Sequence, residues 1–301
     1  MADNEVFVEV EGRHLKLTNL DKVLYPSHGF TKGEVIDYYT RIAPVLLPHL
    51  VDRPLTIKRY PNGVDAPFFF EKNAARGTPS WVRTITLPVP GSTKDRETID
   101  YVVVQELADL VRLANLAALE LHVPQWWVDD SAYAGTDLLV FDLDPGAPAT
   151  ITECCEVAML LRDLCAQDGL TLFPKTSGNK GMQVSAPIQV TDPMAPSTYA
   201  RALAEKLEKA RPDLVVSKMA KTLRPGRVLV DWSQNNPAKT TVAVYSLRAR
   251  AEPTVSTPLT WDEVAAGGAL RFTSAEVLSR VETLGDLHAD ALTDKFRVEL
   301  S

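Results

Sequence analysis

The sequence predicts an α/β protein with a mixed or antiparallel central sheet, flanking helices and a smaller N-terminal lobe. Segments with the two-residue period of strands alternate with segments of helical period along the chain. Thr-x-x-Glu capping boxes at Thr31 and Thr150 mark helix starts, and Pro-Gly or glycine-rich turns mark strand ends. A chain of 301 residues can bury the substantial core that such a fold needs.

The N-terminal third is expected to hold six strands and one helix. Residues 6–10 alternate apolar and acidic side chains, as an edge strand does, and residues 14–17 can pair with them as a hairpin. A helix begins at Thr31, and Pro44 should kink or end it. The further strands are expected at 55–60, 67–71, 82–89 and 99–104.

The rest of the chain alternates helices and strands. From Glu106 the apolar residues follow a helical period up to Leu121, which places His122 at the helix's C-terminal end. The capped helix from Thr150 ends at Gly169. The remaining strands are expected at 137–145, 170–176, 182–185, 227–232 and 241–247, and the remaining helices at 196–211 and after Thr260 and Ser274. We expect one domain, 1–301, with an N-terminal lobe at about 1–60, a core at about 61–260 and a helical tail at 261–301.

Composition indicates an ordinary globular protein. The apolar fraction of 45% is typical of soluble domains, and neither a bilayer-length apolar run nor a signal peptide is present, which predicts a cytoplasmic protein without a membrane partner. The net charge of −7 argues mildly against a nucleic-acid partner. The basic residues are clustered, however, so the net charge does not exclude such a partner. Cys154, Cys155 and Cys165 lack the Cys-x-x-Cys spacing of a metal or redox site and are expected to be core thiols.

Three acids end predicted strands. Asp142 and Asp144 share one face of a strand because side chains alternate, and like charges on one face need a cation or a raised pKa. The plainer interpretation is that Asp-Pro-Gly is only a turn. Asp231 ends the strand at 227–232. Three such carboxylates could hold two divalent cations for in-line nucleotidyl transfer, and oxygen ligands favour Mg²⁺ or Mn²⁺.

Three further features have both a functional and a plain interpretation. The turn 177–181, Ser-Gly-Asn-Lys-Gly, could aim backbone N–H groups at an anion, or be an ordinary hairpin turn with a solvated lysine. The run Phe68–Phe70 could stack on bases, although three consecutive aromatic residues cannot all face one way on a strand. His122 could bind a triphosphate or make a local hydrogen bond.

Taken together, these residues resemble the polymerase domain of bacterial ligase D, within the archaeo-eukaryotic primase superfamily. The likeness runs from about Leu17 to about Arg250. The segments that carry it are 20–26 (LDKVLYP), 53–61 (RPLTIKRYP), 69–72 (FFEK), 121–126 (LHVPQW), 141–146 (FDLDPG), 176–181 (TSGNKG), 230–235 (VDWSQN) and 245–250 (YSLRAR).

The resemblance implies a primase-type fold and a template-dependent nucleotidyltransferase of non-homologous end joining. Such an enzyme fills short gaps and extends DNA ends, prefers ribonucleotides to deoxyribonucleotides, and uses two ions of Mn²⁺ or Mg²⁺. The implied partners are gapped or broken double-stranded DNA with a 5′-phosphate, nucleoside triphosphates, a DNA ligase and Ku. The implied location is the bacterial cytoplasm, at the nucleoid.

The resemblance also implies a role for each matching residue. Asp142, Asp144 and Asp231 match the catalytic, metal-binding acids. The positions matching the nucleotide site are His122, Ser177, Lys180, Gly181, Gln183, Gln234, Arg248 and Arg250. The positions matching the DNA site are Lys22, Lys32 and Lys58 for the 5′-phosphate, Phe69 and Phe70 for stacking near the template base, and Arg224 near the template.

The chain departs from the family at Gln183, where a histidine is common. Glutamine cannot be a cationic phosphate ligand, so we expect weaker nucleotide binding or a shifted metal or sugar preference. No ligase lysine motif or phosphoesterase module follows Arg250, and Met1 begins the chain, so we expect a stand-alone relative rather than an excised domain. The alternatives to a polymerase are a metal-dependent phosphodiesterase and a catalytically weak scaffold that binds DNA ends.

Overall fold

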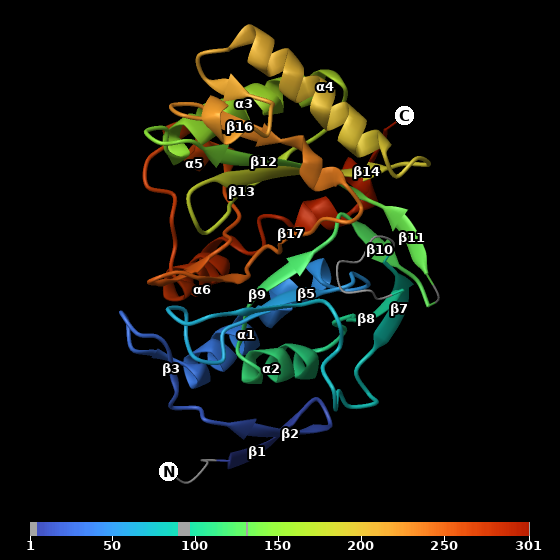
Figure 1. The fold of residues 1–301 in the computed structure, drawn as a ribbon, viewed down its shortest axis with the longest axis vertical. Coiled ribbons are helices and arrows are strands. Elements are labelled where there is room, and N and C mark those ends of the chain that lie inside the picture. Colours follow the sequence, from blue (N-terminus) through green and yellow to red (C-terminus); the bar gives the residue numbers. More distant parts are fainter. Residues whose placement is uncertain (1–4, 90–96, 131, 301) are drawn as a thin grey trace.

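Two large hydrophobic cores divide the molecule into a lower and an upper lobe (Figure 1), and a small third cluster lies around Ile85 and Tyr101. The structure, a computed structural model, describes residues 5–89, 97–130 and 132–300. The lower core takes its residues from Leu15 to Val123 and again from Ala243 to Val277, whereas the upper core begins at Leu139. Residues on both sides of the boundary expected near residue 60 belong to this lower core, and the division into lobe, core and tail stays a prediction.

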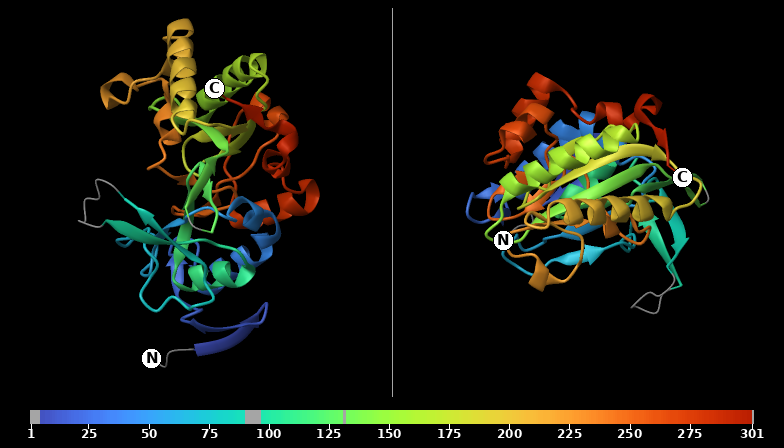
Figure 2. Two further views of the ribbon diagram at one scale, coloured as in Figure 1. Left: turned by 90° about the vertical axis from the view of Figure 1, so that its right-hand side faces the viewer. Right: turned by 90° about the horizontal axis from the view of Figure 1, so that it is seen from above.

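The upper lobe is built on a six-stranded sheet in the order β13-β14-β12-β16-β15, with β20 beside β14. Its neighbours are antiparallel except for the parallel pairs β15–β16 and β14–β20, so the mixed sheet is confirmed. Helices α3 and α4 pack on one face (Figure 2). The bounds are β12 Leu138–Pro145, β13 Phe173–Thr176, β14 Met182–Gln189, β15 Val215–Val216, β16 Val228–Asp231, β20 Val298–Glu299, α3 Ile151–Gln167 and α4 Ala195–Ala210.

The lower lobe packs a four-stranded sheet, in the order β17-β9-β5-β6, against helices α1 and α2. Two hairpins, β1–β2 and β7–β8, lie at its edges (Figure 1). The bounds are β1 Glu5–Val10, β2 Arg13–Thr18, β5 Thr56–Arg59, β6 Phe69–Glu71, β7 Thr84–Pro88, β8 Thr98–Val102, β9 Ala118–Val123, β17 Thr241–Val242, α1 Lys32–Leu46 and α2 Leu107–Asn115.

Smaller elements complete the fold. The hairpins β3–β4 and β18–β19 belong to the lower lobe, while β10–β11 joins the lobes. The helices predicted after Thr260 and Ser274 are confirmed as α5 and α6. The bounds are β3 Val23–Tyr25, β4 Phe30–Thr31, β10 Trp126–Val128, β11 Tyr133–Thr136, β18 Leu247–Ala249, β19 Pro253–Val255, α5 Trp261–Ala266 and α6 Ser274–Leu284, with 3₁₀ turns at Leu47–His49, Lys221–Leu223, Trp232–Asn235, Ala289–Leu292 and Asp294–Phe296.

The helix predicted from Glu106 to Leu121 is wrong in its second half. Helix α2 ends at Asn115, and Ala117 adopts a left-handed φ of 57° that reverses the chain into β9. His122 therefore lies within a strand and not at a helix end. The alanines at 114, 117 and 118 continue the helical period, but from Leu119 onward polar and apolar residues alternate, which is the strand period.

Other local predictions are partly corrected. The capping boxes at Thr31 and Thr150 both form. Helix α1 continues through Pro44 to Leu46, so Pro44 does not end it. The strand expected at 241–247 is two short strands, β17 and β18. The three cysteines are buried and unpaired, which confirms them as core thiols, and no helix among residues 5–89, 97–130 and 132–300 is long and apolar enough to cross a membrane.

Candidate active site

The three predicted acids come together on one face of the upper sheet. Leu143 packs in the upper core beneath α3, so Asp142 and Asp144 on either side of it face the opposite way, toward the lower lobe. Asp231 ends β16 and lies directly opposite Asp142 in the antiparallel register. The register of β12 with β16 thus brings Asp231 to the face that carries Asp142 and Asp144, although Asp231 is far from them in the sequence.

The gathered carboxylates disfavour one another's charge. Burial raises the pKa of Asp142 to about 7, with a further rise from Asp144 and Asp231, while a hydrogen bond from Gln183 opposes it. Burial and the charge of Asp231 also raise the pKa of Asp144, against the effect of Arg224. Hard oxygen donors in this situation fit a divalent cation, which would remove the repulsion.

The three carboxylates are not arranged as a complete metal site in this structure. Across the described ranges, no group of three or more His, Cys, Asp or Glu side chains is close enough to hold a metal ion. Asp231 instead accepts hydrogen bonds from Ser233 N at 3.0 Å, Ser233 Oγ at 2.5 Å and Gln234 Nε2 at 3.0 Å. Gln234, expected near the nucleotide, therefore contacts one of the three acids.

Gln183 stands beside Asp142 on the next strand. Its Nε2 donates to Asp142 Oδ1 at 3.1 Å, and its Oε1 is buried without a hydrogen-bond partner. Lys175 follows in register on β13, so Asp231, Asp142, Gln183 and Lys175 form one row across four strands. Burial lowers the pKa of Lys175 to about 7, and its Nζ donates to Val242 O at 2.9 Å and Ser256 Oγ at 2.7 Å. The sequence analysis missed Lys175, because only the register reveals this row.

The glycine turn 177–181 lies against Arg248 of the lower lobe. Gly178 has a φ of 68°, and a Cβ there would lie 2.7 Å from Arg248 Cγ. A Cβ on Gly181 would clash with the carbonyl of Leu143. Both positions therefore require glycine. Ser177 Oγ donates to Gly181 O at 2.9 Å, and Lys180 is exposed, so the turn is closed while its lysine is available to an anion.

Glu120 on β9 contacts three basic side chains, and the sequence analysis missed it. Its Oε2 lies 2.9 Å from His122 Nε2 and 3.2 Å from Lys58 Nζ, and its Oε1 lies 3.5 Å from Arg248 Nε. Burial opposes ionisation of Glu120, but the hydrogen bond with His122 and the charges of Arg248, His122 and Lys58 outweigh it and hold its pKa well below its usual range. Burial also lowers the pKa of His122.

The three lysines expected at the 5′-phosphate make different contacts. Lys32 Nζ donates to Thr18 O at 2.5 Å, and burial together with the charge of Lys22 lowers its pKa to about 8. Lys22 Nζ donates to Asn62 Oδ1 at 3.0 Å. Lys22 and Lys32 are thus neighbours, whereas Lys58 contacts Glu120, beside His122 and Arg248, which the sequence analysis expects at the nucleotide.

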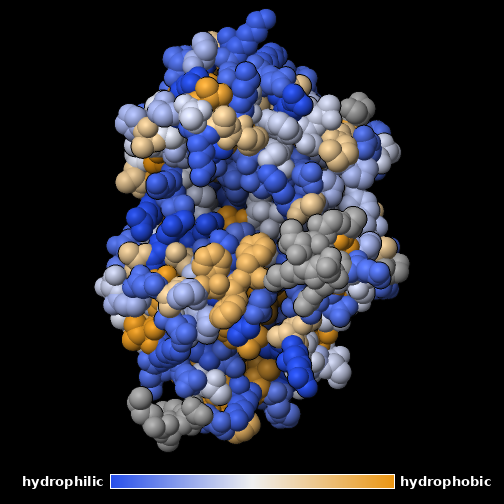
Figure 3. Space-filling model, in the orientation of Figure 1, coloured by the Kyte–Doolittle hydropathy of each residue, from blue (hydrophilic) through white to orange (hydrophobic). Residues whose placement is uncertain are grey.

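The aromatic run lies on the surface of the lower lobe. The side chains of Phe69 and Phe70 are 55% and 46% exposed, which leaves area for stacking. Phe68 stacks on Tyr60 with ring centroids 5.3 Å apart and lies under Lys58 Nζ. Figure 3 shows a largely polar hollow between the lobes and an apolar patch just below it.

The two remaining basic residues expected at the site lie beside its charged groups. Arg224 lowers the pKa of Asp144, and its backbone approaches Gly146 closely. Burial lowers the pKa of Arg250, and the neighbouring charge of Arg248 adds to this effect. Arg224 therefore belongs with the carboxylates, and Arg250 with the cations around Glu120.

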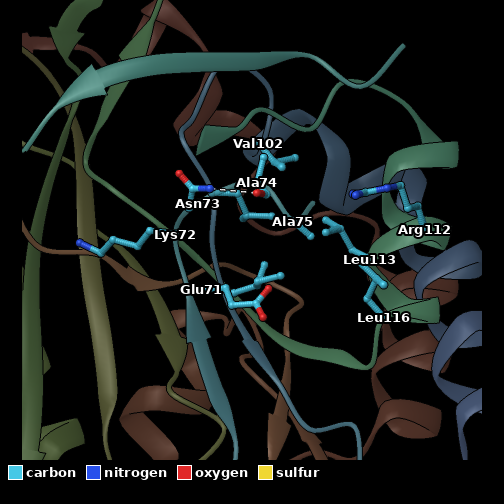
Figure 4. Close-up of a pocket in the computed structure, with 11 residues that line it drawn as sticks. Glu71, Lys72, Asn73, Ala74, Ala75, Val102, Arg112, Leu113 and Leu116 are labelled. Atoms are coloured by element: carbon cyan, nitrogen blue, oxygen red, sulfur yellow. Dashed lines mark hydrogen bonds between the residues drawn. The ribbon is translucent and has the colours of Figure 1, made fainter. Parts of the chain in front are cut away.

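Two cavities differ in their relation to these residues. One, of about 20 Å³, lies in the lower lobe between Glu71, Ala75 and Leu113 (Figure 4), and it has room for about one water. The other, of about 100 Å³, lies between the lobes, and Lys175 and Gln183 are in its lining. The second cavity is therefore next to the row that carries Asp142, although none of the three acids lines it, and both cavities are too small for a nucleotide.

The family model of the LigD primase-polymerase domain matches residues 31–288, which is most of the chain. The chain belongs to the LigD primase-polymerase domain family. Among relatives, it is 45% identical over 276 residues to the multifunctional non-homologous end joining protein LigD of Mycolicibacterium smegmatis, a match covering 91% of this chain and 36% of the relative. It is 30% identical over 274 residues to the bifunctional LigD of Bacillus subtilis, covering 90% and 43%.

Solved structures agree with this family. The polymerase domain from Mycobacterium tuberculosis ligase D in complex with DNA superposes with a TM-score of 0.87 at 42% identity, covering 93% of this chain and 98% of that one. The resemblance inferred from the motifs and the α/β fold are therefore confirmed. This LigD-family chain spans between 36% and 43% of the length of the two curated relatives.

Proposed function

We propose that this chain is a template-dependent DNA repair nucleotidyltransferase that fills short gaps and extends DNA ends. The observation that carries the proposal is the register of β12 with β16, which sets Asp142 opposite Asp231 with Asp144 on the same face. Arg248 connects this face to the basic residues around Glu120, because it touches the glycine turn at Gly178 on one side and lies near Glu120 on the other. Nucleotidyl transfer needs carboxylates that bind a metal ion next to cationic side chains that bind a triphosphate.

Each half of the site has its own task in this proposal. Asp142, Asp144 and Asp231 would hold two ions of Mn²⁺ or Mg²⁺, which would lower the pKa of a primer 3′-hydroxyl and neutralise charge on the leaving pyrophosphate. Arg248, His122 and Lys180 would bind the triphosphate and align its α-phosphorus with the primer end. Ribonucleotides are the preferred substrates in this proposal, as the resemblance implies.

Most of the proposed DNA contacts lie on the lower lobe, while Arg224 lies beside Asp144 of the upper lobe. Lys22 and Lys32, neighbours in the structure, would bind a 5′-phosphate without reading sequence, and the exposed rings of Phe69 and Phe70 would stack beside the template base. The mycobacterial polymerase domain was solved in complex with DNA, which supports DNA as the partner. The proposal places the protein at broken DNA in the bacterial cytoplasm, with a DNA ligase and Ku.

A gapped, 5′-phosphorylated duplex incubated with Mn²⁺ and either NTPs or dNTPs tests this function. We expect primer extension, with NTPs used more readily. Shortening of the primer would instead identify a phosphodiesterase, and a mobility shift without either reaction would identify a scaffold. Asp142→Ala with Asp144→Ala should abolish extension and retain end binding, and synthesis by that variant would overturn the assignment of the acids.

A further inference from the structure

Glu120 is an anion at the place proposed for an anionic substrate. A carboxylate beside a triphosphate repels it, so Glu120 would weaken nucleotide binding unless it does something else there. Its side chain is only 3% exposed and its pKa is held low, so the charge persists in the folded protein. We propose that Glu120 is a positioning residue that fixes Lys58, His122 and Arg248 in the arrangement that receives the triphosphate, an inference that rests on the proposed function.

The contacts of Glu120 fix both side chains and backbone. One oxygen serves His122 and Lys58, and the other lies near Arg248 Nε and accepts a hydrogen bond from Ala249 N at 3.2 Å. The backbone of Arg248 is also held from the other side, because Tyr25 Oη donates to Arg248 O at 3.1 Å. These contacts hold the backbone at Arg248 and Ala249 from both sides and keep the Arg248 side chain beside Glu120.

His122 gains a defined orientation from the same carboxylate. An ionised carboxylate only accepts hydrogen bonds, so Nε2 of His122 must carry its proton toward Glu120. Nδ1 is thereby left facing away from Glu120. Without the carboxylate, three cationic or proton-donating groups would lie together in a buried place and would repel one another.

Two roles for Glu120 predict opposite outcomes when its charge is removed. If Glu120 merely stood near the triphosphate, Glu120→Gln would remove a repulsion and tighten nucleotide binding. If Glu120 positions the cations, the same variant lets them separate and nucleotide binding weakens. The sign of the change therefore decides between the two roles, which a loss of activity alone could not do.

The experiment measures steady-state extension of a gapped, 5′-phosphorylated duplex and binding of a non-hydrolysable α,β-methylene UTP analogue with Mn²⁺. In Glu120→Gln we expect KM for UTP and Kd for the analogue to rise about tenfold, as lost charge-assisted contacts do, with a much smaller change in kcat and unchanged affinity for gapped DNA. Glu120→Asp, which keeps the charge on a shorter side chain, should fall between wild type and Glu120→Gln.

A matched control and a double variant complete the test. Glu263→Gln removes an ion pair with Arg280 on α5 and α6 and should leave KM for UTP unchanged. Because Glu120 acts through Arg248, adding Glu120→Gln to Arg248→Gln should cost less than it does alone. Wild-type or tighter nucleotide binding in Glu120→Gln overturns the proposal; if that variant does not fold, an unchanged KM in Glu120→Asp does so.

The two proposals fail in different ways. If the wild type does not extend the primer, the proposed polymerase function is wrong, while binding of the UTP analogue still tests Glu120. If the wild type extends the primer and Glu120→Gln binds the analogue as well as the wild type does, the function stands and the positioning role of Glu120 is wrong.

Discussion

Asp142 should make the metal-free protein less stable as the pH rises. Its pKa is raised from an ordinary value of 3.8 to about 7, first by burial and then by Asp144 and Asp231. The folded state therefore holds this proton more tightly than the unfolded state does. The stabilisation is complete below pH 3.8 and is lost as the pH rises to about 7.

The shift sets the expected size of the effect. Each pKa unit corresponds to 1.36 kcal/mol, so ionised Asp142 costs the metal-free protein up to about 4 kcal/mol, most of it developing between pH 5 and pH 8. Asp142→Asn removes the charge and keeps the shape. Its stability advantage over the wild type should therefore grow by about 2–3 kcal/mol between these pH values, which raises the difference in Tm by on the order of 5 °C.

Thermal unfolding in EDTA at pH 5 and pH 8 measures this difference. Asp163→Asn, on the exposed surface of α3, is the control and should show no pH-dependent advantage. Adding Mn²⁺ at pH 8 should then raise the Tm of the wild type more than that of Asp142→Asn, because the ion binds the folded state. An advantage of Asp142→Asn that stays constant or shrinks as the pH rises would refute the reasoning.

Three further outcomes are expected. Gln183→His should tighten binding of the UTP analogue severalfold in a fluorescence titration, and unchanged affinity and sugar selectivity would contradict the role given to Gln183. Lys22→Ala with Lys32→Ala should weaken binding of a 5′-phosphorylated gap about tenfold without affecting a 5′-hydroxyl gap, as measured by anisotropy. Phe69→Ala should cost about 1–3 kcal/mol in gap binding, whereas Phe7→Ala, on the distant exposed β1, should cost nothing.

The sequence predicted the parts of the site that short-range patterns define. Asp142 and Asp144 were expected on one face because a strand alternates, and the structure confirms that face. The glycine turn was expected between two strands and lies there. The register of the strands cannot be predicted from a local pattern, because it depends on pairs formed by distant segments. This is why the sequence did not predict that Asp231 stands opposite Asp142 or that Lys175 continues the row.

Glu120 was missed for a different reason. The segment 118–123 places Glu120 and His122 between Leu119, Leu121 and Val123, which is the strand period, but alanines before it extend the helical pattern of α2. A helix would have turned these two side chains to different sides, whereas a strand sets both on one face, where they form a hydrogen bond. Motifs that match a family identify groups that touch the substrate; the carboxylate that would hold those groups in place becomes visible only when the strand, its face and its neighbours are known together.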